Sequence, residues 1–143
     1  MTDPRSPLRL QDFAGLWQVD RQIDDRLGQP MRFGGQARLS WEGDRLIYDE
    51  QGQLWGGNGP PLVATRRYLW HADGIRVAVT FEDGRPFHHF DPSRPGSRAS
   101  HHCAPDQYDV RYEFGTWPVW QSHWQVRGPR KDYAMQTFYR RQF

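Results

Sequence analysis

The stretch "GIRVAVTFEDG", residues 74–84, indicates the fold class of this chain. Its larger side chains alternate with polar or small ones, at the period of a half-buried strand. The alternating residues are Ile75, Val77, Val79 and Phe81. Asp83-Gly84 then forms a strong two-residue hairpin signal, because both positions tolerate positive φ. The stretch therefore predicts a strand that turns back onto an antiparallel partner.

The same alternation recurs on both sides of this stretch, with turn residues between the segments, which is typical of an antiparallel meander. Gly56 to Pro61 carries too many breakers to be anything but a loop. About ten strands are expected. They cover about residues 17–23, 33–41, 46–50, 64–70, 75–81, 85–90, 99–103, 108–114, 120–126 and 133–139.

One short helix is expected, over residues 7–13, with Ser6 as its N-cap and Pro7 at its first position. No later segment has the length and period of a helix that could cover a sheet. Consecutive strands without covering helices must close on themselves or stack as a sandwich. We therefore expect an all-β protein, a closed antiparallel up-and-down barrel of about ten strands, with the short helix plugging one end.

Length and composition predict one domain, 1–143, in the cytoplasm. The chain has 143 residues, one cysteine and no apolar run of about 20 residues, and its start lacks a signal-peptide core. We expect no membrane partner. The net charge is only +2 and the arginines are scattered, which argues against nucleic acid as a partner. Neither the oligomeric state nor a cofactor can be read from the sequence.

The stretches "FAGLWQVDRQI" (13–23) and "FYRRQF" (138–143) resemble the first and last strands of lipocalins and related calycin barrels. The resemblance implies that Arg141, with Arg140 as the alternative, packs across Trp17 and ties the barrel ends together. Most of residues 13–141 also resembles an uncharacterised family of short calycin-like proteins. That resemblance rests on "DGRPFHHFDP", "HHCAPDQYDVRY" and "GPRKDYAMQTFYRR", and it implies a fold but no established activity.

A set of polar residues shares the parity of the inward-facing apolar ones. It comprises Arg21, Tyr48, Glu50, Arg66 and Tyr68. Arginine and glutamate are rarely buried unless paired, so the set predicts either an internal Arg–Glu network or a barrel interior that holds a ligand.

We interpret the chain as a small-molecule binding protein whose barrel holds an anionic aromatic or conjugated ligand. Arg21 and Arg66 would donate to a carboxylate, while Tyr48 and Tyr68 orient the molecule, and Tyr108 joins the candidate ligand-binding residues. The alternative is a barrel enzyme of the lyase or isomerase type. By resemblance to the phenolic acid decarboxylases, Glu50 would then act as general acid or base, with Tyr48 and Arg66 at a small carboxylate substrate. An RNA- or protein-binding surface is the third, least favoured hypothesis.

Residues 83–112 hold four of the six histidines and the single cysteine, Cys103. If the strands 85–90 and 99–103 pair with each other, His88 faces His102 and His89 faces His101, although a shift of one residue would reverse these orientations. We expect His88 and His102 to lie at the pocket, with Phe87 and His89 pointing the other way. The spacing matches no strong metal motif, so no metal site is predicted. Cys103 is interpreted as a small buried hydrophobe rather than a nucleophile.

Overall fold

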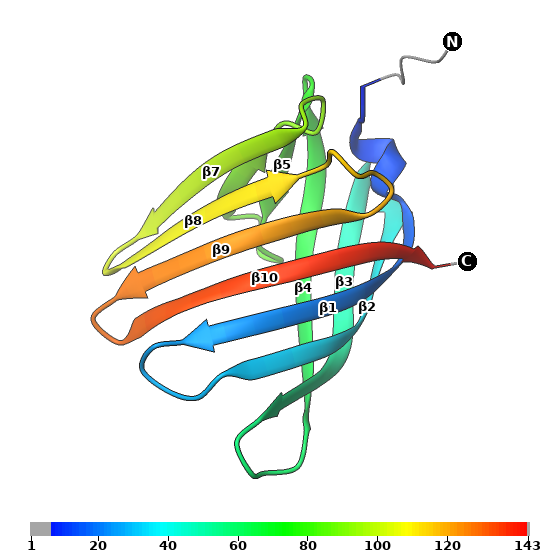
Figure 1. The fold of residues 1–143 in the computed structure, drawn as a ribbon. Helices are drawn as coiled ribbons and strands as arrows, with labels where there is room; N and C mark the ends of the chain where they lie inside the picture. Colours follow the sequence, from blue (N-terminus) through cyan, green and yellow to red (C-terminus); the bar gives the residue numbers. More distant parts are fainter. Residues whose placement is uncertain (1–6, 143) are drawn as a thin grey trace.

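The computed structural model describes residues 7–142, which form one antiparallel sheet of ten strands in the order β6-β5-β4-β3-β2-β1-β10-β9-β8-β7. The sheet curls into a nearly closed up-and-down barrel, with β1 beside β10 (Figure 1). The all-β prediction is confirmed. In chain order the elements are η1 (Leu10–Phe13), β1 (Gly15–Asp25), β2 (Met31–Glu42), β3 (Arg45–Gly56), β4 (Leu62–Asp73), β5 (Arg76–Thr80), β6 (Pro86–Phe90), β7 (Gly96–Cys103), β8 (Asp106–Glu113), β9 (Trp120–Gly128) and β10 (Lys131–Gln142).

The predicted helix is shorter than expected. Instead of spanning residues 7–13, it is a single 3-10 turn, η1, and the expected cap Ser6 lies outside the described residues. The Asp12 carboxylate stabilises this turn by accepting a hydrogen bond from the Arg9 backbone amide at 2.7 Å. The helix ends at Phe13, because the backbone of Ala14 is already extended. The turn still plugs one end of the barrel, because Phe13 is fully buried and meets Trp70 and Trp120 edge-on.

The plugged end is also where the first and last strands are tied together. The Arg141 guanidinium lies 4.1 Å from the centroid of the Trp17 ring and donates to the carbonyls of Ala14 and Asp12, both at 2.8 Å. Arg140 is exposed. The expected contact between Arg141 and Trp17 is therefore confirmed.

The predicted pairing of the two histidine strands is wrong. β6 pairs with β5, which places His88 opposite Val79, and β7 pairs with β8, which places His102 opposite Gln107. Each strand takes the neighbour to which a tight turn connects it: the Asp83-Gly84 hairpin joins β5 to β6, and Ala104-Pro105 joins β7 to β8. Within residues 7–142, β6 and β7 form the two ends of the sheet with no ladder between them.

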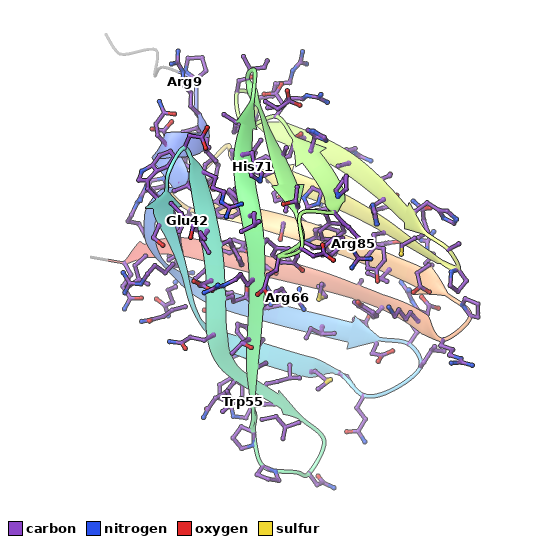
Figure 2. The ribbon with its side chains drawn as sticks, turned by 180° about the vertical axis from the view of Figure 1, so that it is seen from behind. Arg9, Glu42, Trp55, Arg66, His71 and Arg85 are labelled. Atoms are coloured by element: carbon purple, nitrogen blue, oxygen red, sulfur yellow. The ribbon has the colours of Figure 1, made fainter. Side chains whose placement is uncertain are left out.

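The barrel wall is incomplete beside β4. This strand pairs with β3 from Leu62 to Trp70, but the much shorter β5 reaches only the part from Leu69 to Asp73. The stretch Leu62–Tyr68 therefore has a strand neighbour on one side only, as far as the described residues show. Figure 2 shows Arg66 on this stretch, below the ends of the shorter strands. In the same part of the chain, no helix has the length and apolar character needed to cross a membrane.

Candidate functional site

A cavity of about 280 Å³ lies inside the barrel and is walled mainly by aromatic side chains. Six of the eight predicted ligand-binding residues line it: Arg21, Tyr48, Arg66, Tyr68, His88 and Tyr108. The other two, Glu50 and His102, do not. The remaining lining residues are Trp70, Val79, Phe81, Phe87, His101, Cys103, Tyr112, Trp120, Ser122, Trp124, Val126, Tyr133, Met135 and Tyr139.

Arg21 and Glu50 form a buried ion pair beside the cavity. Nη1 and Nη2 of Arg21 each donate to one oxygen of Glu50 at 2.8 Å, and Nε donates to Thr137 Oγ1 at 2.8 Å. Both side chains are buried, with 5% and 4% of their surface exposed. The geometry is the two-pronged pairing that makes arginine–carboxylate contacts strong. The predicted internal network therefore exists, and it engages Nε, Nη1 and Nη2 of Arg21.

The carboxyl of Glu50 is held in its charged form. Burial alone would raise the pKa of Glu50, but the hydrogen bonds and charge of Arg21 outweigh it and hold that pKa below its usual range. Tyr48 donates to the same carboxylate, and burial followed by the charge of Glu50 raises the pKa of the Tyr48 phenol. Glu50 thus faces Arg21 rather than the cavity, and the enzyme alternative gains no support from this geometry.

Arg66 differs from Arg21 in having no carboxylate partner. Its Cα lies opposite that of Glu50 in the β3–β4 ladder, it shares the inward parity of Tyr68, and it lines the cavity. Among residues 7–142, no carboxylate forms an ion pair with it; the Tyr68 phenol interacts with its guanidinium, and much of the surface of Arg66 is exposed. Its neighbour Arg67 points outward and pairs with Asp49 at 2.6 Å. Arg66 is therefore a cation at the open edge of β4 with its donors available.

A register shift in β6 brings two consecutive side chains into the cavity. Val79 pairs with His88 and Thr80 pairs with Pro86, so Phe87 is the extra residue of a bulge. Phe87 and His88 are both buried, at 8% and 7% exposed, and both line the cavity. The expectation that Phe87 points away from His88 is wrong for this reason, since simple alternation fails at a bulge. His89 does point outward, with its Nε2 3.2 Å from an oxygen of Asp73.

Phe87 is the centre of the aromatic wall. Its ring stacks on Phe81, Trp124 and Tyr68, with centroids 4.6, 5.3 and 5.7 Å away. It also meets His101 of β7 edge-on at 5.2 Å. These contacts span the seam between β6 and β7, so side-chain packing holds together a part of the barrel that has no ladder.

His88 is a neutral, buried imidazole. Its Nε2 lies 2.8 Å from the Tyr112 hydroxyl. Burial, followed by the nearby His89 and His101, lowers the pKa of His88 to about 3, so the ring is uncharged near neutral pH. The predicted position of His88 at the cavity agrees with the structure, whereas His102 is exposed and lies 3.1 Å from Gln107 Oε1.

The rest of the histidine segment is distributed differently from the prediction. His101, rather than His102, lines the cavity, and Cys103 lines it too. Cys103 is exposed, so the expectation of a small buried residue is wrong. The reason is its position, because Cys103 is the last residue of β7. Within residues 7–142, no three histidine, cysteine, aspartate or glutamate side chains cluster closely enough to hold a metal ion.

The model of a family of unknown function, DUF6314, matches residues 13–141. The chain belongs to this family. No curated protein matches the sequence significantly. An S-type phycobiliprotein lyase from Guillardia theta has a similar fold, with a TM-score of 0.64 and 7% identity over 94% of this chain and 90% of that one. A protein of unknown function from the DUF3598 family of Nostoc punctiforme has a TM-score of 0.60 and 13% identity over 94% of this chain. This DUF6314 chain spans 49% of the length of that protein. Both likenesses concern the fold alone and agree with the barrel described above.

Sequence reasoning missed most of the cavity wall in the DUF6314 chain. Tyr112, Trp120 and Trp124 were expected on strands but not assigned to the site, although they share the parity of inward residues on β8 and β9. A consistent parity count along those two strands would have found them. Phe87 could not have been found in this way, because the bulge reverses its parity.

Proposed function

We propose that this protein binds a small anionic molecule with an aromatic or conjugated body inside its barrel. The observation that carries the proposal is that Arg66 lines an aromatic cavity and has no carboxylate partner in the part of the chain that the structure describes. The internal cation, Arg21, is already neutralised by Glu50, so Arg66 is the arginine that offers free donors to a carboxylate.

The cavity has the character of a small-ligand site. Its volume, about 280 Å³, is near the lower end of the range for small-molecule pockets, which begins at about 300 Å³. Stacked rings such as Phe87, Trp124 and Tyr68 offer flat apolar surfaces to a planar molecule. The likeness of the fold to a protein named as a phycobiliprotein lyase supports a role in small-molecule binding without identifying the ligand.

Cinnamate tests this proposal, because it is a small conjugated carboxylate. Its binding can be followed by calorimetry and by quenching of tryptophan fluorescence. Hydrogen bonds to a charged group contribute about 1.5–3 kcal/mol, so Arg66→Gln is expected to weaken cinnamate binding about tenfold or more. Arg67→Gln is the matched control, because Arg67 is the outward neighbour already paired with Asp49. It should leave the affinity unchanged.

Two results would count against the proposal. Equal losses in Arg66→Gln and Arg67→Gln would mean that the effect is general charge attraction, and equal binding of cinnamate and the neutral cinnamamide would remove the role of the anion. Native mass spectrometry of the protein purified from its own host is the complementary measurement. A retained acidic small molecule is expected there, and it should be lost from Arg66→Gln.

A further inference from the structure

Two side chains that line the cavity each carry a buried nitrogen atom that has no hydrogen-bond partner in the part of the chain that the structure describes. The atoms are Nδ1 of His88 and Nε1 of Trp120. Their side chains are 7% and 1% exposed, and both line the cavity. Both rings lie next to Tyr112, with centroid distances of 5.9 Å for His88 and 6.4 Å for Trp120. A buried polar atom without a partner costs about 1–3 kcal/mol, so such atoms are rare without a reason.

The contact of Tyr112 determines which nitrogen of His88 carries the proton. The phenol oxygen of Tyr112 lies 2.8 Å from Nε2, and this is its one hydrogen bond within residues 7–142. If Nε2 donated, the buried hydroxyl proton of Tyr112 would have no acceptor. If Tyr112 donates, Nε2 is the acceptor, and the neutral imidazole must carry its proton on Nδ1. Tyr112 therefore makes Nδ1 a hydrogen-bond donor.

The indole Nε1–H of Trp120 can only donate. Two residues that line the cavity thus carry buried donors without a partner among residues 7–142, in addition to the cation Arg66. We propose that the cavity selects molecules that carry, besides the carboxylate, an acceptor oxygen such as a carbonyl or ether, to which His88 Nδ1–H donates, with Trp120 Nε1–H as a second, separate donor. This inference rests on the proposed function and narrows it to carboxylates with a second oxygen acceptor and an aromatic body.

The first test is the tautomer of His88 in the protein without ligand. Long-range ¹H–¹⁵N NMR spectra distinguish a protonated from an unprotonated ring nitrogen. We expect Nδ1 to be protonated and Nε2 to be unprotonated. In Tyr112→Phe the phenol donor is gone, and the preference for the Nδ1–H form should weaken. A wild-type His88 protonated at Nε2 would overturn the inference, whatever the protein binds.

The second test compares two carboxylates of similar shape, 4-acetylbenzoate and 4-isopropylbenzoate, of which only the first has a carbonyl acceptor. We expect the wild-type protein to prefer 4-acetylbenzoate about tenfold, the effect of one or two hydrogen bonds to otherwise unpaired donors. His88→Phe should lose most of this preference. His88→Gln should retain part of it, because an amide can accept from Tyr112 and donate to the ligand.

The outcomes separate this inference from the proposed function. If both benzoates bind the wild-type protein equally, the inference is wrong and the proposed function stands. If neither binds and cinnamate also fails to bind, the proposed function is wrong, and with it the inference. Arg66→Gln should weaken both benzoates by the same factor and leave the preference intact. If the preference for 4-acetylbenzoate disappears in Arg66→Gln but survives in His88→Phe, the selectivity comes from Arg66 rather than from His88. That result would overturn the inference.

Discussion

Two arginines that point into the barrel differ in what balances their charge. The sequence predicted an inward polar set but left open whether it forms an internal network or contacts a ligand. The structure contains the internal network at Arg21, and no carboxylate of residues 7–142 forms an ion pair with Arg66. Arg21 on β1 reaches Glu50 on β3 past β2, where Ala37, the residue opposite Glu50, is small. Such a contact depends on the register of two successive ladders, which parity alone does not determine.

Removing one partner of the Arg21–Glu50 pair should be far more destabilising than removing both. Glu50→Ala leaves a buried guanidinium without its counter-charge, and we expect a loss of about 3–5 kcal/mol in the free energy of unfolding. The double variant Arg21→Met/Glu50→Leu should lose much less, because apolar side chains of similar volume often replace a buried pair at little cost. Urea denaturation of both variants measures this. Equal losses would show that the pair is not coupled.

The same pair should make stability depend on pH. The pKa of Glu50 is depressed in the folded state, because Arg21 outweighs the opposing effect of burial, and it returns to its ordinary value of about 4.3 on unfolding. The stabilisation is thus complete above that ordinary value and is lost as pH falls through the folded-state pKa. Urea titrations from neutral pH down to about pH 3 should show a steeper decline for wild type than for Glu50→Gln. Parallel curves would contradict the assignment to Glu50.

The bulge in β6 is the element that most changes the site relative to the sequence prediction. It places Phe87 and His88 on the same side of the sheet, so Phe87 bridges the seam to His101 of β7. With simple alternation, Phe87 would share the outward face with His89, and the seam would lose the ring at its centre. The bulge thus provides both a wall for the cavity and a contact between the two ends of the sheet.

Alanine substitutions at the two residues flanking His88 test this bulge. Phe87→Ala should lower the free energy of unfolding by about 3 kcal/mol or more, because it removes a buried ring from a packed cluster. His89→Ala should cost less than about 1 kcal/mol, since it removes only a partly exposed contact with Asp73. Thermal or urea unfolding provides the comparison. Similar, small losses at both positions would mean that β6 alternates regularly and that Phe87 is not inside.

Strands and turns could be predicted from the sequence, whereas the pairing of one strand with another could not. The alternation over residues 75–81 and the Asp83-Gly84 turn placed β5 and its hairpin, and "FAGLWQVDRQI" with "FYRRQF" indicated the contact between Trp17 and Arg141. The pairing of 85–90 with 99–103 failed because Ala104-Pro105 also makes a tight turn, which provides β7 with a closer partner. The failure at His102 follows directly, since its orientation was inferred from that pairing.

The barrel as a whole is paired most completely on one side and least completely on the other. β1 has a ladder on both sides, to β2 and to β10, over most of its length. Across the barrel, the described part of the chain has no ladder between β6 and β7, and β4 has one strand neighbour from Leu62 to Tyr68. Arg66 lies on this weakly paired side and lines the cavity, whose other walls include the well-paired β1 and β10.

Amide hydrogen exchange should reveal this asymmetry. Successive residues of an antiparallel strand direct their backbone groups to opposite sides, so about every second amide between Leu62 and Tyr68 has no strand acceptor. We expect these amides to exchange rapidly, by local fluctuation, whereas those of β1 from Gln18 to Arg21 exchange only in large-scale unfolding. Residue-resolved NMR exchange measures both sets in one sample. Repeating the measurement at a tenfold lower protein concentration controls for self-association, which could cover the β4 edge. Uniform slow exchange along Leu62–Tyr68 at both concentrations would contradict an open edge.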